Sequence, residues 1–169
     1  VLFADIVNFT VMSEKLSAEN IVGFLDDMFS KFDELTEKYE VEKIKTIGDA
    51  YMVVSGLTSE NRSHASILFE FGQELLKIAS NYKDHKGEPI TLRIGINSGP
   101  AVSGVIGKSK FSFDIWGDTI NTAARLESYG IPSKIHMSEK TFELINQNIE
   151  HQKKTIEIKG KGLVQTVII

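Results

Sequence analysis

Two aspartates, Asp5 and Asp49, each stand beside apolar runs of the chain. Asp5 follows the run Val1-Leu2-Phe3-Ala4, and Asp49 belongs to a Gly-Asp pair between apolar-rich runs at 41–47 and 50–56. A Gly-Asp pair in that setting is typical of a tight hairpin turn, which holds a carboxylate rigidly at its tip. Two carboxylates at the ends of neighbouring strands can hold two divalent cations, and two cations can run phosphoryl or nucleotidyl transfer.

Each aspartate also has a simpler interpretation when it is taken alone. An Asp after a strand is more often a turn former or a helix cap, and Asp49 could be only the turn residue of its hairpin. The segment Ile6–Thr10, however, must leave a strand and enter a helix. Its backbone N–H groups would then be free to cradle a phosphate beside a metal held by Asp5. Two carboxylates at adjacent strand ends therefore favour the metal-site hypothesis.

Further polar side chains could complete such a site. Asn121 and Arg125 are four residues apart on a predicted helix and share one of its faces. One interpretation is a solvated surface pair. The other is that Asn121 contacts a ribose and Arg125 neutralises the charge of a phosphoryl group. The segment Lys159-Gly160-Lys161-Gly162 is likewise either a mobile turn with solvated lysines or a positive charge that closes over a polyphosphate.

Two other patterns are not assigned any chemistry. The segment Gly104–Ser109 resembles the tail of a P-loop, but position 102 is Val where that motif needs Gly, and no helix clearly follows. The four histidines, at 64, 85, 136 and 151, lack the spacing of metal ligands. Solvated or capping roles are expected for them.

Length and composition describe an ordinary globular chain and exclude several classes of protein. Its 169 residues suffice for one domain, and 41% of them are hydrophobic and 25% charged. The net charge of −4 gives no sign of a nucleic-acid partner. Because there is no cysteine, a disulfide scaffold, a thiolate zinc site and a cysteine nucleophile are excluded. No apolar run approaches the roughly 18 residues that a membrane span needs.

The elements that must position these side chains follow from periodicity and turn residues. Ser17 precedes a helix whose apolar stripe recurs every three or four residues, Ile21, Phe24, Leu25, Met28, Phe29, Phe32 and Leu35. The other predicted elements are a strand at 1–7, the hairpin 41–47/50–56, a helix at 62–82, a strand at 90–96 turned back by 97–100 into a strand at 101–106, a helix at 118–128, a strand at 134–137, a short helix from 138 and a hairpin 155–159/164–169. The sum is an α+β, ferredoxin-like βαββαβ sandwich with an extra C-terminal helix and β-hairpin, in one domain.

Five ordered segments resemble the catalytic domain of class III nucleotidyl cyclases. They are residues 3–10, 42–52, 93–100, 113–128 and 159–162, and the resemblance spans nearly the whole chain. It implies a head-to-tail homodimer with its active sites at the interface. It also implies that residues 1–169 are a catalytic domain taken from a longer, cytoplasmic or membrane-anchored protein with an unseen upstream regulatory domain.

The resemblance also implies a role for each matching residue. Asp5, Asp49 and the Ile6 carbonyl would bind two Mg²⁺ or Mn²⁺ ions per active site. The phosphates would be contacted by a four-residue segment, Val7, Asn8, Phe9 and Thr10. The partner subunit would supply three side chains, Asn121 for the ribose, Arg125 for the transition state and Lys159 for the terminal phosphates.

Lys45 and Asp114 match the base-selecting pair of the family, which the partner subunit would also supply. Guanylyl cyclases typically have Glu at the first of these positions and Cys or another small residue at the second, so Lys and Asp follow the adenylyl pattern. Adenine offers N1 as an acceptor and its amino group as a donor, which complements a lysine and a carboxylate. Guanine reverses both edges, and each buried mismatch costs about 1–3 kcal/mol.

These features predict an adenylyl cyclase. It would convert ATP to 3′,5′-cyclic AMP and pyrophosphate by two-metal-ion, in-line attack of the ribose 3′-hydroxyl on the α-phosphate. A guanylyl cyclase is the alternative within the same class, disfavoured by Lys45 and Asp114. A catalytically silent dimerisation or nucleotide-sensing module is the alternative from another class, disfavoured by the intact set of acidic and basic side chains.

Overall fold

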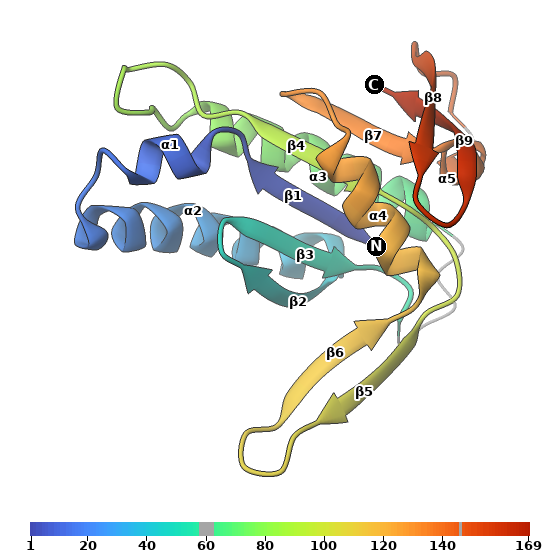
Figure 1. Cartoon of the computed structure of the whole chain (residues 1–169), viewed down its shortest axis with the longest axis horizontal. Coiled ribbons are helices and arrows are strands. Elements are labelled where there is room, and N and C mark those ends of the chain that lie inside the picture. Colours follow the sequence, from blue (N-terminus) through green and yellow to red (C-terminus); the bar gives the residue numbers. More distant parts are fainter. Residues whose placement is uncertain (58–62, 146) are drawn as a thin grey trace.

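A seven-stranded β-sheet forms the centre of the protein (Figure 1). The structure is a computed structural model, and it describes residues 1–57, 63–145 and 147–169. The strand order of the sheet is β2-β3-β1-β4-β7-β9-β8, and β5 and β6 form a separate two-stranded sheet. None of the helices in the described ranges has the length and apolar character that crossing a membrane requires. The elements, in chain order, are β1 (Leu2–Ile6), α1 (Phe9–Ser13), α2 (Ala18–Tyr39), β2 (Glu42–Ile47), β3 (Ala50–Val54), α3 (His64–Ser80), β4 (Leu92–Ile96), β5 (Val102–Ile106), β6 (Ser112–Trp116), α4 (Asp118–Ser128), β7 (Lys134–Ser138), α5 (Glu139–Ile145), β8 (Gln152–Ile158) and β9 (Gly162–Ile168).

The first four strands of the large sheet confirm the ferredoxin-like prediction. Strand β1 lies between β3 and β4 and is antiparallel to both, and β2 flanks β3. With α2 between β1 and β2, and α3 between β3 and β4, the order along the chain is βαββαβ. The sheet then continues through β7, parallel to β4, to the final hairpin β9–β8.

Alternate residues of β1 contribute to two different hydrophobic clusters. Leu2, Ala4 and Ile6 belong to the large cluster with α2 and α3, whereas Phe3 packs in a second cluster with α4. This period of two is that of a strand buried on both faces. Helix α2 contributes the predicted stripe, with Met28 and Phe32 fully buried at its centre. The sheet is therefore covered by α2 and α3 on one face and by α4 on the other.

The expected return of the chain after β4 is wrong. Residues 97–100 do not turn β5 back onto β4, because both edges of β4 are already paired, with β1 and β7. Strand β5 pairs instead with β6, whose strand character the sequence interpretation missed. The helix expected at 62–82 is α3, which ends at Ser80, and Arg62 lies outside the described residues.

The β5–β6 hairpin projects from the body of the molecule (Figure 1). It contains the rejected P-loop resemblance: Gly104 lies inside β5, and the next element along the chain is the strand β6 rather than a helix. Several large apolar side chains on the hairpin are exposed, namely Val102 68%, Val105 61%, Ile106 57%, Phe111 78%, Phe113 41% and Trp116 39%. Exposed apolar clusters of this kind are typical of surfaces that contact another protein, a membrane or a ligand.

Gly95 allows α4 to pack directly on β4, which gives a first prediction. A Cβ atom at Gly95 would lie 2.2 Å from the Glu127 nitrogen and 2.4 Å from the Ala123 oxygen, both backbone atoms of α4. We expect Gly95→Ala to displace α4 and to lower the free energy of unfolding by about 1–3 kcal/mol, measured by urea denaturation.

Gly23 on α2 offers the matched control. A Cβ atom there would meet nothing within 4 Å, so we expect Gly23→Ala to leave stability unchanged or to raise it by about 0.4–1 kcal/mol. Equal effects of the two substitutions would contradict the close packing of α4 on β4.

Candidate active site

The structure brings the two predicted aspartates together. Asp5 lies at the end of β1, directly opposite Ala50 of β3 in the register, and Asp49 immediately precedes Ala50. Gly48 and Asp49 form the two-residue loop between β2 and β3, in which Gly48 has a φ of 61°. Only glycine adopts that backbone conformation without steric cost, so the Gly-Asp pair places the carboxylate beside β1.

The carboxylates of Asp5 and Asp49 interact with each other electrostatically. Burial, followed by the charge of Asp5, raises the pKa of Asp49 to about 6. On the other side of Asp5, the guanidinium of Arg93 lies 2.6 Å from the Asp5 carboxylate. Two half-buried carboxylates that repel one another fit a hard divalent cation, because Mg²⁺ is commonly held by one or two carboxylates with phosphate oxygens and water. Across the described ranges no group of three or more His, Cys, Asp or Glu side chains could hold a metal.

The segment after Asp5 differs in part from expectation. It leaves β1 and enters α1 through Asn8, whose φ of 60° is left-handed and whose side chain makes no capping bond. The N–H of Val7, however, donates to the Thr91 carbonyl at 3.0 Å and is therefore not available to a phosphate. The expectation of free amides was wrong for Val7 and stays a prediction for residues 8–10.

Lys45 and Asp114 form an ion pair although they are far apart in the sequence. Lys45 lies on β2, and its ammonium donates to the carboxylate of Asp114, in the middle of β6 and opposite Gly104 of β5. This hydrogen bond holds the pKa of Asp114 below its usual range. A donor and an acceptor thus stand side by side, as reading the edge of a nucleobase requires.

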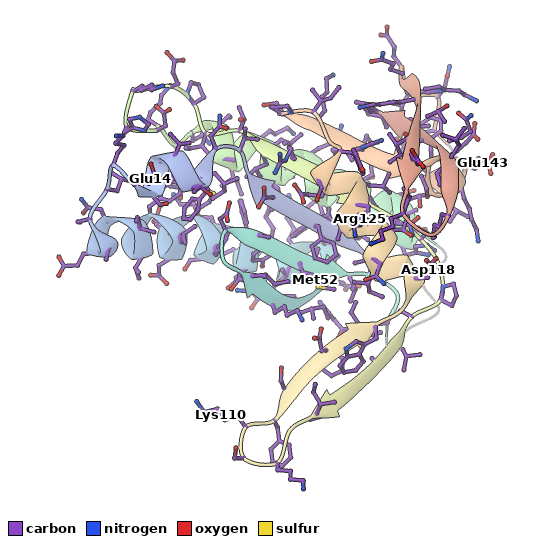
Figure 2. All side chains as sticks on the ribbon, in the orientation of Figure 1. Glu14, Met52, Lys110, Asp118, Arg125 and Glu143 are labelled. Carbon is purple, nitrogen blue, oxygen red and sulfur yellow. The ribbon has the colours of Figure 1, made fainter. Side chains whose placement is uncertain are left out.

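Three unpaired polar side chains line a cavity of about 460 Å³ beside α4. Asn121 and Arg125 come from α4, and Lys159 comes from the β8–β9 loop. Among the residues that the structure describes, none of these three side chains has a hydrogen bond or an ion pair. Figure 2 shows Arg125 and Asp118 together on α4, which faces this loop. The cavity therefore presents two cations and an amide to whatever enters it.

The two lysines of the Lys-Gly-Lys-Gly segment differ in their surroundings. The Lys161 ammonium donates to the Asp118 carboxylate at 2.5 Å and to the Thr122 hydroxyl at 2.7 Å. Lys161 thereby fastens the β8–β9 loop to the start of α4, whereas Lys159 remains unpaired. Of the two, Lys159 is the one available to a ligand.

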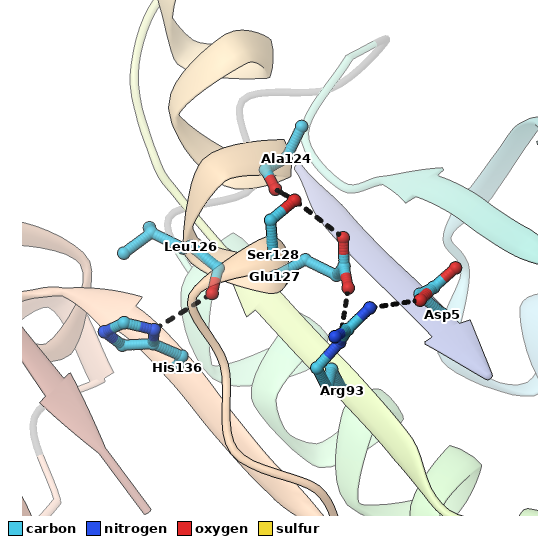
Figure 3. A network of polar contacts seen from close by, with 7 residues as sticks. All are labelled: Asp5, Arg93, Ala124, Leu126, Glu127, Ser128 and His136. Carbon is cyan, nitrogen blue, oxygen red and sulfur yellow. Dashed lines mark hydrogen bonds and ion pairs between the residues drawn. The ribbon is translucent and has the colours of Figure 1, made fainter. Parts of the chain in front are cut away.

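The sequence interpretation missed Arg93 and Glu127. The Arg93 guanidinium contacts Asp5 and also lies 3.0 Å from the Glu127 carboxylate of α4 (Figure 3). Burial, followed by the charge of Asp5, raises the pKa of Glu127. Arg93 could have been found from the sequence only with the strand register, because it lies directly opposite Asp5 on β4.

His136 has a structural role. Of the two roles expected for the histidines, solvated or capping, the solvated one is wrong here, because His136 is buried. It is fully buried, and one ring nitrogen lies 2.9 Å from the Leu126 carbonyl at the end of α4 (Figure 3). The other ring nitrogen lies 2.8 Å from the Thr166 hydroxyl. Burial lowers the pKa of His136 to about 4. The neutral imidazole anchors α4 to the sheet.

Comparisons with known proteins agree on one family. A family model described as "Adenylate and Guanylate cyclase catalytic domain" matches residues 1–169. The adenylate cyclase of Mycobacterium tuberculosis is 39% identical over 167 residues, which are 98% of this chain and 38% of that protein. The guanylate cyclase soluble subunit beta-2 of Rattus norvegicus is 40% identical over 178 residues, covering 100% of this chain and 25% of that protein.

A solved structure shares the fold over almost its full length. It is described as the catalytic core of a rhodopsin-guanylyl cyclase with converted specificity in complex with ATPαS, and it superposes with a TM-score of 0.92. Its sequence identity is 37%, over 99% of this chain and 91% of that chain. By contrast, the chain spans 38% of the length of the mycobacterial relative.

Proposed function

The chain belongs to the family of adenylate and guanylate cyclase catalytic domains, and from this premise we propose that it is an adenylyl cyclase. It converts ATP to 3′,5′-cyclic AMP and pyrophosphate. Adenylate and guanylate cyclases are about equally similar to it, at 39% and 40% identity, so overall similarity does not select the base. The observation that carries the proposal is the Lys45–Asp114 pair.

The chemistry of this pair complements adenine. The Lys45 ammonium can donate to adenine N1, and the Asp114 carboxylate can accept from the adenine amino group. Against guanine the ammonium would meet the N1–H donor, and the carboxylate would meet the O6 acceptor. Buried polar groups left unpaired in this way cost about 1–3 kcal/mol each, which disfavours GTP.

Asp5 and Asp49 are proposed to hold two Mg²⁺ or Mn²⁺ ions, together with the Ile6 carbonyl. When bound, such ions supply charge that stabilises the transition state and favours deprotonation of the ribose 3′-hydroxyl. Residues Asn8–Thr10 would contact the phosphates from the start of α1. The repulsion between Asp5 and Asp49, which contributes to the raised pKa of Asp49, supports a cation between them.

The remaining groups are proposed to act from the partner subunit of a head-to-tail homodimer. Asn121 of the partner subunit would orient the ribose, and Arg125 of the partner subunit would neutralise charge at the reacting phosphate. Lys159 of the partner subunit would contact the terminal phosphates. The unpaired state of these three side chains supports this assignment, and the exposed apolar β5–β6 hairpin supports association with a second copy.

Complementation between two inactive variants tests the shared site. We expect Asp49→Ala and Arg125→Ala each to be inactive alone, and their mixture to regain activity. In the heterodimer one site carries both lesions and the other site carries neither, so up to half of the wild-type activity per heterodimer returns. Cyclic AMP production by the mixture is measured with Mn²⁺ present. Heterodimer formation is checked by pull-down with two different tags, and no rescue in a sample that contains heterodimers would mean that one chain builds each site.

Cyclic nucleotide production separates the proposed function from its alternatives. With Mn²⁺ we expect the purified chain to produce cyclic AMP from ATP in clear excess over cyclic GMP from GTP. A reversed preference would identify a guanylyl cyclase. Tight nucleotide binding without either product would identify a silent sensing module.

A further inference from the structure

Arg93 joins two parts of the protein that the proposed function assigns to different active sites. Its Nη2 atom donates to Asp5 at 2.6 Å, and its Nε atom donates to Glu127 at 3.0 Å (Figure 3). Asp5 lies on β1 in the cation-binding half of the site. Glu127 lies on α4, the helix that carries Asn121 and Arg125. One guanidinium therefore bridges the cation site and this helix.

We propose that Arg93 is an internal counter-cation and a tether, which couples cation binding at Asp5 to the position of α4. Without a divalent cation, Arg93 neutralises Asp5 and holds the last turn of α4 through Glu127. A cation that binds Asp5 displaces the guanidinium from that carboxylate and so changes its hold on α4. The inference rests on the proposed function for the identity of the cation site.

The balance of charge supports competition between Arg93 and a cation. The carboxylates of Asp5 and Glu127 share the Arg93 guanidinium, and Asp49 stands beside Asp5, next to its register partner Ala50. The formal charge of these three carboxylates exceeds the single positive charge of Arg93. A divalent cation relieves this excess. It also repels the guanidinium that shares Asp5 with it, because like charges at such distances disfavour one another.

The packing of α4 explains why the helix would respond. Glu127 is 9% exposed, and its second carboxylate oxygen lies 3.3 Å from the Ser128 hydroxyl, which in turn donates to the Ala124 carbonyl at 3.0 Å. The backbone of α4 also rests directly on Gly95 of β4. A change at Arg93 is therefore passed to the last turn of a well-packed helix. In the proposed dimer Asn121 and Arg125 face the partner's site, so the tether would link the two active sites.

Cation affinity without nucleotide is the first test. Mn²⁺ is titrated into the protein by calorimetry at about pH 8, which is above the raised pKa of Asp49 of about 6. Since one charge within a few ångströms commonly alters an ionic equilibrium by tenfold or more, we expect Arg93→Met to bind Mn²⁺ about tenfold more tightly than the wild type. Lys134→Met is the matched control, because Lys134 is an exposed cation on β7, directly opposite Arg93. The Mn²⁺ affinity of this variant should stay within about twofold of the wild-type value.

Hydrogen exchange of α4 separates a tether from simple electrostatics. We expect Mn²⁺ to alter the exchange of the amides at 124–128 in the wild type and not in Arg93→Met. Arg93→Lys keeps the charge but lacks the planar fork that reaches two carboxylates. We therefore expect it to bind Mn²⁺ within about threefold of the wild type and to lose the response of α4. This variant also serves if Arg93→Met does not fold.

The outcomes distinguish failure of the tether from failure of the metal assignment. Mn²⁺ binding to the wild type with no change in α4 would overturn the tether alone. Unchanged affinity in Arg93→Met would overturn the role of Arg93 as a counter-cation. Absence of Mn²⁺ binding to the wild type, or binding that survives Asp5→Asn and Asp49→Asn unaltered, would overturn the proposed cation site and the coupling with it.

Discussion

Replacing Asp5 or Asp49 by alanine will lower cyclase turnover by about 10²-fold or more while the protein remains folded. Each replacement removes one of the two carboxylates that are proposed to hold the cations, and transition-state charge is then left without stabilisation. The fold should survive because Asp5 lies near the end of β1, Asp49 lies in the turn between β2 and β3, and both are only partly buried. The measurement is cyclic AMP production at saturating Mn²⁺ and ATP, with circular dichroism to confirm folding.

Asp27 on α2 provides a matched aspartate. Its side chain is 60% exposed and bonded to Lys31 and Tyr82, which are not part of the site. Asp27→Ala should therefore retain turnover within about twofold of the wild type, as surface substitutions usually have small effects. Turnover near the wild-type value in a folded Asp5→Ala or Asp49→Ala variant would overturn the two-cation assignment.

The second large effect concerns the choice of base. We expect the double variant Lys45→Glu, Asp114→Cys to change the ratio of kcat/KM for ATP over GTP by about 10²-fold or more in favour of GTP. The new glutamate can accept from guanine N1–H and N2–H, and the small thiol removes a carboxylate that would repel O6. Specificity is a difference between two affinities, so loss of the repulsive group matters as much as the gain of an attractive one.

Single variants and a control on the same strand sharpen this test. Lys45→Glu alone or Asp114→Cys alone should mainly lose activity, because one mismatched contact remains in each. Lys43 also lies on β2 but pairs with Asp33, so Lys43→Met should leave the ATP preference unaltered. If the folded double variant keeps the preference of the wild type, Lys45 and Asp114 do not read the base, and the adenylyl assignment loses its main support.

The features that the sequence determined by itself depend on short stretches of chain. The Gly48-Asp49 turn was predictable because only a few residue types adopt its backbone, and the stripe on α2 was predictable because a buried helix face repeats every 3.6 residues. The chain order of the predicted elements then implied the ferredoxin-like fold. The structure confirms these predictions. They could be made from the sequence because each depends on residues close together in the chain.

Only the tertiary structure determined which distant residues meet. The Lys45–Asp114 contact spans 69 positions and the Arg93–Asp5 contact spans 88, and no local pattern records either. The resemblance named Lys45 and Asp114 as a pair, whereas Arg93 and Glu127 lie within resembling segments but were assigned no role. In the same way, β5 pairs with β6 because β4 had already paired on both edges, and Lys161 is bound to Asp118 while Lys159 is not. Which strand or side chain pairs with which depends on the edges and polar groups that the rest of the fold leaves unpaired. These are defined only once the strands and helices are packed together.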